Sequence, residues 1–202
     1  MIIDLHTHSI KSDDGRAKVD NYCKWIRKKE LPIDGFVLTE HRQFDDESDY
    51  RHLEDEYGLV ILKASEVETD YGHVLVFGVN EDLVNTFDFA DVTNPIGDVL
   101  AAAERCGAFA APCHPGRKRV GLFSHYEEKG SVEGVHTVEV LNGGSIPGEE
   151  FGYKTFGGSD SHIVSRIGYC ATDFASDSIE TIDDLIAELR TGKYQPVTYR
   201  EQ

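Results

Sequence analysis

Apolar residues in this chain form short runs of strand length, separated by segments with the periodicity of a helix. Runs at residues 2–5 and 35–39 are typical of buried strands. Between them, four residues follow the spacing of one helix face: Val19, Tyr22, Cys23 and Ile26. The same criteria predict strands at 59–66, 73–77, 107–111, 137–141 and 154–156, and helices at 48–57, from 94 and from 181. This alternation favours a mostly parallel sheet or barrel.

One connection departs from the alternation. Residues 67–72 are too few for a helical crossover, so the strands on either side should form an antiparallel hairpin. A hairpin brings the end of one strand next to the start of the following one. Glu66 and His73 are therefore expected at the same rim of the sheet.

Two helix starts carry capping signals. Asn94 followed by Pro95 is typical of an N-cap followed by the first helical residue. Thr181 with Asp184 three residues later resembles a capping box, with aspartate in place of the usual glutamate. Gly192 is expected to end that last helix.

Length and charge limit the classes of function. The 202 residues fit one domain, expected to span 1–202, with enough chain to bury a core. With 37 acidic and 20 basic residues the formal charge is −17, which argues against nucleic acid as a stable partner. Divalent cations would supply positive charge locally, where an anionic substrate could bind. The sequence carries no signal for an oligomeric state.

The compartment is inferred from the cysteines and from the absence of targeting signals. The four cysteines form no C-x-x-C pair, and neither a signal peptide nor an apolar run of membrane-spanning length is present. We therefore expect reduced thiols, no membrane contact and a cytoplasmic protein. Cys113 precedes His114 and is interpreted as a buried filler in preference to a metal ligand.

Histidines and carboxylates recur where the predicted strands end. Functional groups of β/α barrels gather at the carboxyl ends of strands, so these residues should converge. The set is His6, His8, His41, Glu66, His73, His114, Asp160 and His162. Imidazole and carboxylate ligands suit zinc, manganese or iron. Glu66 and Asp160 are the candidates to bridge two ions, because a carboxylate has two oxygens and a neutral imidazole has one lone pair.

A basic cluster follows one of these histidines. Arg117, Lys118 and Arg119 come directly after His114-Pro115-Gly116. Arginine can bind two phosphate oxygens at once, so Arg117 and, further along, Arg166 are candidates for substrate binding. A solvated basic loop is the alternative. His125 is either a surface residue or a pocket group that binds substrate, whereas His52 and His136 are expected away from the site.

Together these motifs resemble the polymerase and histidinol phosphatase (PHP) family, in the family's order and over almost the whole chain. The resemblance rests on His6-x-His8, Asp13 in Ser-Asp-Asp-Gly, Thr-Glu-His41, Glu66, His73, His114-Pro-Gly-Arg and Gly-Ser-Asp160-Ser-His162. It implies a distorted (β/α)7-type barrel with two or three divalent ions at the carboxyl ends of the strands.

The resemblance also implies how the ligands divide among three ions. The first would lie among His6, His8, Glu66 and Asp160; the second among Asp13, His41 and His162; the third among Glu66, His73 and His114. Asp14 is adjacent to Asp13, which makes Asp13 the least certain ligand.

The function expected from this site is hydrolysis of a phosphate ester of a small molecule by a hydroxide that bridges metal ions. Glu66, Asp160 and His162 are the expected catalytic residues. The alternatives are a nuclease or phosphodiesterase of the same family, a metal-stabilised binding module without activity, and an amidohydrolase. The sequence does not choose the ester.

Overall fold

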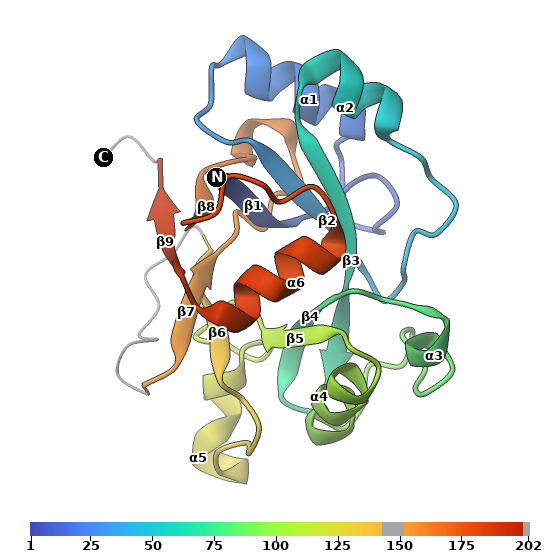
Figure 1. Cartoon of the computed structure of the whole chain (residues 1–202). Helices are drawn as coiled ribbons and strands as arrows, with labels where there is room; N and C mark the ends of the chain where they lie inside the picture. Colours follow the sequence, from blue (N-terminus) through green and yellow to red (C-terminus); the bar gives the residue numbers. More distant parts are fainter. Residues whose placement is uncertain (143–151, 200–202) are drawn as a thin grey trace.

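The computed structural model describes residues 1–142 and 152–199, which form a curled sheet covered by short helices (Figure 1). Seven strands form this sheet, in the order β5-β4-β3-β2-β1-β8-β9. They are β1 (Ile2–Thr7), β2 (Gly35–His41), β3 (Val60–Thr69), β4 (Gly72–Phe77), β5 (Phe109–Pro112), β8 (Cys170–Phe174) and β9 (Tyr194–Thr198). Two further strands, β6 (Thr137–Leu141) and β7 (Lys154–Gly157), pair with each other in parallel.

The sheet is mixed, which corrects the expectation of a mostly parallel one. Only the pairs β1–β2 and β2–β3 are parallel in the seven-stranded sheet, and the other four pairs are antiparallel. The connections from β4 to β5 and from β8 to β9 contain helices and still join antiparallel neighbours. Alternating strand and helix patterns therefore did not determine strand direction here.

The pair β6–β7 completes a distorted barrel. β6 contacts β5 on one side, and β7 contacts β1, β8 and β9 on the other. Gly157 at the end of β7 donates its N–H to Thr172 Oγ1 of β8 and accepts the hydroxyl of the same residue. The expected α/β fold with a distorted barrel is thus confirmed.

Helices cover the sheet through three apolar clusters. α1 (Val19–Lys28) and α2 (Arg51–Tyr57) lie together on one side and pack on Phe36, Leu38 and Ile61 (Figure 1). α4 (Ile96–Arg105) packs on Val74 and Val76 of β4. α6 (Ile182–Thr191) crosses the inner side of the curled sheet and buries its apolar face there: Leu185, Ile186 and Leu189. The remaining helices, α3 (Glu81–Val84), α5 (Tyr126–Lys129), η1 (Leu122–His125) and η3 (Val164–Arg166), are single turns in loops.

Several local predictions are confirmed and one is wrong. β3 and β4 form the expected antiparallel hairpin, and Thr181 and Asp184 form a complete capping box at α6, which Gly192 ends in the left-handed conformation. The N-cap of α4 is Pro95 and not Asn94. The Asn94 side chain instead donates to the Asp88 and Asp91 carbonyls of the preceding loop, so bonds within that loop outcompete the capping preference.

Among residues 1–142 and 152–199, every helix is too short or too polar to cross a lipid bilayer.

Candidate metal centre

Strand pleating explains why ligand-type side chains converge inside the curled sheet. Leu62 and Ala64 of β3 face the inner core, and Glu66 shares their face because side chains alternate along a strand. The same count places His73 of β4 with Leu75 and Phe77. Both residues therefore continue the inner apolar face toward the rim of the barrel.

A bulge in β1 brings the first two histidines to this inner face. Ile3 and Leu5 pack in the inner core, so simple alternation would direct His6 and His8 outward. The pairing of β1 with β2 shifts register between Asp4 and Thr7, with one extra residue on β1. Such a bulge changes the face on which the following side chains emerge. Both imidazoles are consequently fully buried inside the cluster.

The Glu66 carboxylate divides the cluster into two halves. Its Oε1 atom lies 2.7 Å from His73 Nδ1 and 3.0 Å from His114 Nε2. Its Oε2 atom lies 3.0 Å from His6 Nε2, 3.1 Å from His8 Nε2 and 3.4 Å from His41 Nδ1. A carboxylate with imidazoles on both oxygens has the arrangement of a ligand that bridges two ions.

Asp160 faces the Oε2 half of this cluster. Its Oδ1 atom is 3.4 Å from His6 Nε2 and 3.3 Å from His8 Nε2, while Oδ2 accepts a hydrogen bond from Arg117 at 2.6 Å. His6, His8, Glu66 and Asp160 thus present atoms close enough to share one ion.

A second group contains His8, His41 and His162, whose ligand atoms also lie close enough to share one ion. Asp14 belongs with it, because its Oδ2 atom lies 3.0 Å from His162 Nε2 and 3.6 Å from His41 Nε2. Asp13, the residue that the motif resemblance assigns here, is paired with Arg42 at 2.5 Å. The structure therefore brings Asp14, not Asp13, to the two histidines.

The arrangement of nitrogen atoms fits cation binding. The Nε2 atoms of His6 and His8 face each other at 3.0 Å, so two lone pairs or one proton must fill the space between them. His41 Nδ1 is buried without a hydrogen-bond partner, although it faces Glu66 Oε2. Nitrogen and carboxylate donors directed at common points are the donor set of zinc, manganese and iron sites.

Glu139 orients two of the candidate ligands from behind. The carboxylate is fully buried; Oε1 lies 3.0 Å from His6 Nδ1, and Oε2 accepts the backbone N–H of His114 at 2.8 Å. A carboxylate on the far nitrogen of an imidazole fixes its tautomer and increases its basicity as a ligand. Gly158 allows this approach, since a Cβ atom there would lie 2.7 Å from Glu139 Oε1 and 2.5 Å from His6 Cβ.

Glu40 and Asp4 act on the backbone around the site. Glu40 accepts the Ser9 backbone N–H and the Ser12 hydroxyl, and the Ser12 oxygen lies 3.3 Å from His8 Nδ1. Asp4 accepts backbone N–H groups from His6 and Ser159 in addition to one from Gly168. Both carboxylates hold the loops that carry the ligands.

Burial and the neighbouring carboxylates together determine which imidazoles of the cluster carry a proton. Burial opposes charge on His6, but Glu139, Glu66 and Asp160 outweigh it and raise the His6 pKa well above its usual value. Burial also opposes charge on His8, yet its contacts with Asp160 and Glu66 raise its pKa to about 9. Burial lowers the pKa of His41 to about 4, so this imidazole is neutral at pH 7. The protons on His6 and His8 thus occupy positions where metal cations would bind, so protons and metal ions compete for these nitrogens.

A cavity of about 500 Å³ opens onto the cluster. Its walls include five carboxylates, Asp13, Asp14, Glu66, Glu68 and Asp160, against three arginines, Arg16, Arg42 and Arg117. An excess of carboxylates would repel a phosphate ester, so added cations are needed before an anion can bind. Arg16 and Arg42 were missed by sequence reasoning, because neither lies in a basic cluster or a motif.

Two residues predicted to bind substrate lie outside this cavity wall. Arg166 is exposed on η3, and His125 Nε2 lies 2.9 Å from the Arg119 carbonyl, next to the Tyr71 ring. Of the three predicted substrate-binding residues, only Arg117 lines the cavity.

Backbone strain is concentrated at the same place. Arg42, His114 and Asp160 have positive φ angles of 55°, 32° and 50°, and all three line the cavity. Residues other than glycine adopt this conformation at a cost, which surrounding structure must offset, and such residues cluster at functional sites.

Residues 149–194 match the PHP_C family, described as PHP-associated. No curated protein sequence matches the chain. Among solved structures, 98% of the chain aligns with a two-domain protein from Bacteroides vulgatus that contains a predicted PHP-like metal-dependent phosphoesterase (TM-score 0.68, 20% identity). The aligned region spans 65% of that protein.

Two further structures share the fold. PsfC from Pseudomonas syringae aligns over 98% of this chain and 91% of its own (TM-score 0.67, 17% identity). The lesion-specific endonuclease PfuEndoQ from Pyrococcus furiosus aligns over 96% of this chain and 57% of its own (TM-score 0.66, 15% identity). Residues 149–194 are thus similar to a PHP-associated segment, and the chain shares the barrel fold of these three structures.

Proposed function

We propose that the buried cluster binds divalent metal ions and that the protein hydrolyses phosphate esters. The observation that carries this proposal is the Glu66 carboxylate, which faces His73 and His114 with one oxygen and His6 and His8 with the other. A fully buried carboxylate among so many imidazoles is difficult to explain as a packing feature.

We propose three ion positions. The first lies among His6, His8, Glu66 and Asp160, and the third among Glu66, His73 and His114. For the second, the distances favour Asp14 with His41 and His162 over the expected Asp13. Ions of this kind supply charge neutralisation and an activated water for attack on phosphorus. Glu66, Asp160 and His162 remain the proposed catalytic residues, since they face the cavity where the ester would react.

The protein's own residues would position the ester. Arg117 Nη2 lies at the cavity wall, held by Asn142 Oδ1 and Asp160 Oδ2 at 2.6 Å each. Its guanidinium can turn from these acceptors to phosphate oxygens once a cation neutralises Asp160. Arg42 and Arg16 also line the cavity and can contact the rest of the substrate.

A small phosphorylated molecule is the substrate class that we propose. A cavity of about 500 Å³ is of the size that encloses small ligands. The formal charge of −17 disfavours a long polyanion, which needs an extended basic surface.

A nuclease is the second candidate. The P. furiosus protein that shares this fold is a lesion-specific endonuclease. That likeness keeps nucleotides and nucleic acid ends among the esters to test, although the chain carries a formal charge of −17.

The test is metal-dependent release of phosphate. Purified protein, stripped with a chelator and reloaded with zinc, manganese or iron, is assayed on p-nitrophenyl phosphate, its bis-ester, a panel of phosphorylated metabolites and labelled oligonucleotides. His8→Ala and Asp160→Asn should abolish turnover in folded protein, while His52→Ala, an exposed histidine on α2, should not. Full activity of either site variant would refute the proposal, and cleavage of oligonucleotides alone would select the nuclease.

We also propose that residues 1–202 act as one PHP-type domain in the cytoplasm. The inner core draws on residues from β1 through α6, so the described parts fold around one centre. Cys23, Cys106 and Cys113 are free thiols, which is typical of a reducing compartment.

A further inference from the structure

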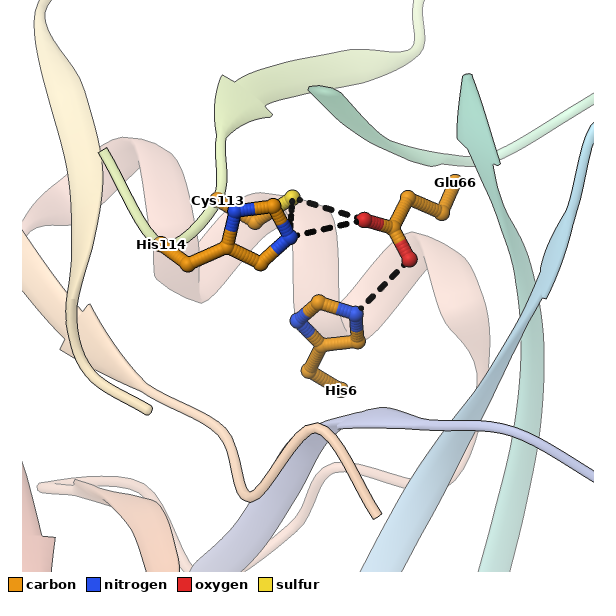
Figure 2. Close-up of side chains that lie close together, drawn as sticks. All are labelled: His6, Glu66, Cys113 and His114. Carbon is orange, nitrogen blue, oxygen red and sulfur yellow. Dashed lines mark hydrogen bonds and ion pairs between the residues drawn. The ribbon is translucent and has the colours of Figure 1, made fainter. Parts of the chain in front are cut away.

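A thiol lies among the proposed metal ligands. Cys113 Sγ is fully buried, 3.2 Å from Glu66 Oε1 and 3.4 Å from His114 Nε2 (Figure 2). His6 approaches the same carboxylate through the other oxygen, so the sulfur belongs to the Oε1 half of the cluster.

The backbone is shaped so that two consecutive side chains reach this point. Cys113 continues the inner face of β5 after Ala111, and its N–H is held by the His73 carbonyl. Side chains of consecutive residues in an extended strand point to opposite faces, so His114 would normally point outward. Its φ angle of 32° turns the chain and directs the imidazole back toward Glu66.

The spacing of the three atoms fits a shared ion. With bonds of about 2.0 Å to nitrogen or oxygen and 2.3 Å to sulfur, two ligand atoms on a tetrahedral zinc lie roughly 3.3–3.6 Å apart. The separations here are 3.2 Å and 3.4 Å for the sulfur pairs and 3.0 Å between His114 Nε2 and Glu66 Oε1. A shift of a few tenths of an ångström would open the space for an ion.

We propose that Cys113 is a metal ligand, bound through its thiolate to the ion that Glu66 and His114 hold. This inference rests on the proposed function, because it takes the cluster to be a metal centre. The Sγ–metal bond forms as the S–H proton leaves to solvent, with no change of oxidation state. Thiolate is a softer donor than imidazole or carboxylate, so it biases this position toward zinc or iron and away from manganese and magnesium.

The other cysteines provide the contrast. Cys23 is buried in the apolar cluster between α1 and the sheet, and of the four cysteines only Cys113 falls in a group of candidate ligands among the described residues. If Cys113 is only a hydrogen-bond donor to Glu66, its sulfur will remain a thiol when metal binds.

The experiment measures sulfur at the metal directly. Wild-type protein loaded with zinc under reducing conditions is examined by X-ray absorption at the zinc edge, and cobalt-loaded protein by near-ultraviolet absorption. We expect a sulfur scatterer at about 2.3 Å from zinc and a thiolate-to-cobalt charge-transfer band. Cys113→Ser should lose both signals, and Cys23→Ser should keep both.

The outcomes separate the two proposals. Zinc bound with only nitrogen and oxygen neighbours, together with no charge-transfer band, would overturn the thiolate ligand and leave the metal centre intact. Failure of the folded wild-type protein to bind zinc, cobalt, manganese or iron would overturn both. The wild-type spectra decide the question even if Cys113→Ser does not fold.

Discussion

His73 Nδ1 lies 2.7 Å from Glu66 Oε1 across the β3–β4 hairpin. The two residues are not direct partners in the ladder, where Glu66 pairs with Leu75 and Glu68 with His73. The contact is diagonal, between side chains on the same face of neighbouring strands. A short hairpin thus places an imidazole on one oxygen of the carboxylate and leaves the other free for β1.

This position makes Glu66→Gln the most informative single substitution. Glutamine keeps the shape of the side chain but removes the charge and one acceptor, so ions on both sides of residue 66 lose a ligand. We expect lower metal content and a fall in kcat/KM of more than about 100-fold, since partners that only orient ligands are worth roughly 10–100-fold.

Elemental analysis and steady-state kinetics measure both effects. Glu104→Gln is the control, because that side chain is 82% exposed, pairs with Arg190 and lies in no candidate ligand group of the described residues. Unchanged metal content in Glu66→Gln would contradict the bridging role.

Asp13 and Asp14 provide a matched pair of variants. Asp14 faces His162 and His41, whereas Asp13 is paired with Arg42. We expect Asp14→Asn to weaken binding of one ion at least about 10-fold, and Asp13→Asn to leave metal content close to wild type. Metal titrations of the two variants, followed by calorimetry, check this. A larger loss in Asp13→Asn would restore the assignment made from the motif.

The same pair shows what the sequence could and could not specify. Eight of the nine expected ligands converge, because they lie at or just beyond strand ends that meet at one rim of the barrel. Adjacent aspartates in a loop have no such periodicity. Their directions depend on how the loop is held, for example by Gly15, where a Cβ atom would lie 1.9 Å from the Ser9 carbonyl oxygen.

The sequence also did not predict the directions of the strands or the residues that orient the ligands from outside the cluster. The segments of β8 and β9 mix polar with apolar residues, so no apolar run revealed them, and with them the antiparallel side of the sheet. Glu139 orients His6 and His114 from β6, which pairs in parallel with β7. The local pattern of residues does not predict that pairing. The sequence likewise did not predict the bulge in β1. The spacing of His6 and His8 is nevertheless that of two residues on one face of a strand.

Arg117 is expected to act on substrate affinity. Its guanidinium is held at the cavity wall by Asp160 and Asn142, and Lys118 beside it is exposed and lines no part of the cavity. Loss of a charge-assisted contact of about 1.5–3 kcal/mol predicts a rise in KM of roughly 10–100-fold for Arg117→Ala. Lys118→Ala should match wild type. Equal KM values for the two variants would show that Arg117 does not contact the ester.

The pH dependence of stability should differ between metal-free and metal-loaded protein. The His8 pKa is about 9 in the folded protein without metal, against its ordinary value of 6.5. A raised folded pKa contributes stability that is complete below pH 6.5 and is lost as pH rises through 9. The contribution is up to about 3 kcal/mol, at about 1.4 kcal/mol per pKa unit, and His6 shifts in the same direction.

Two other buried groups do not change the pH dependence of stability between pH 6.5 and 9. The pKa of Asp4, raised to about 6 by burial, gives a contribution already lost by pH 6.5, and His41 with a pKa of about 4 stays neutral. Ligation requires unprotonated imidazoles, so metal-loaded protein should lack the His8 effect. We expect the Tm of chelator-treated protein to fall between pH 6.5 and 9 and the stabilisation by zinc to grow over the same range. His8→Ala should flatten the metal-free profile, and a Tm that is constant or rising in metal-free wild type would show that His8 does not hold a proton there.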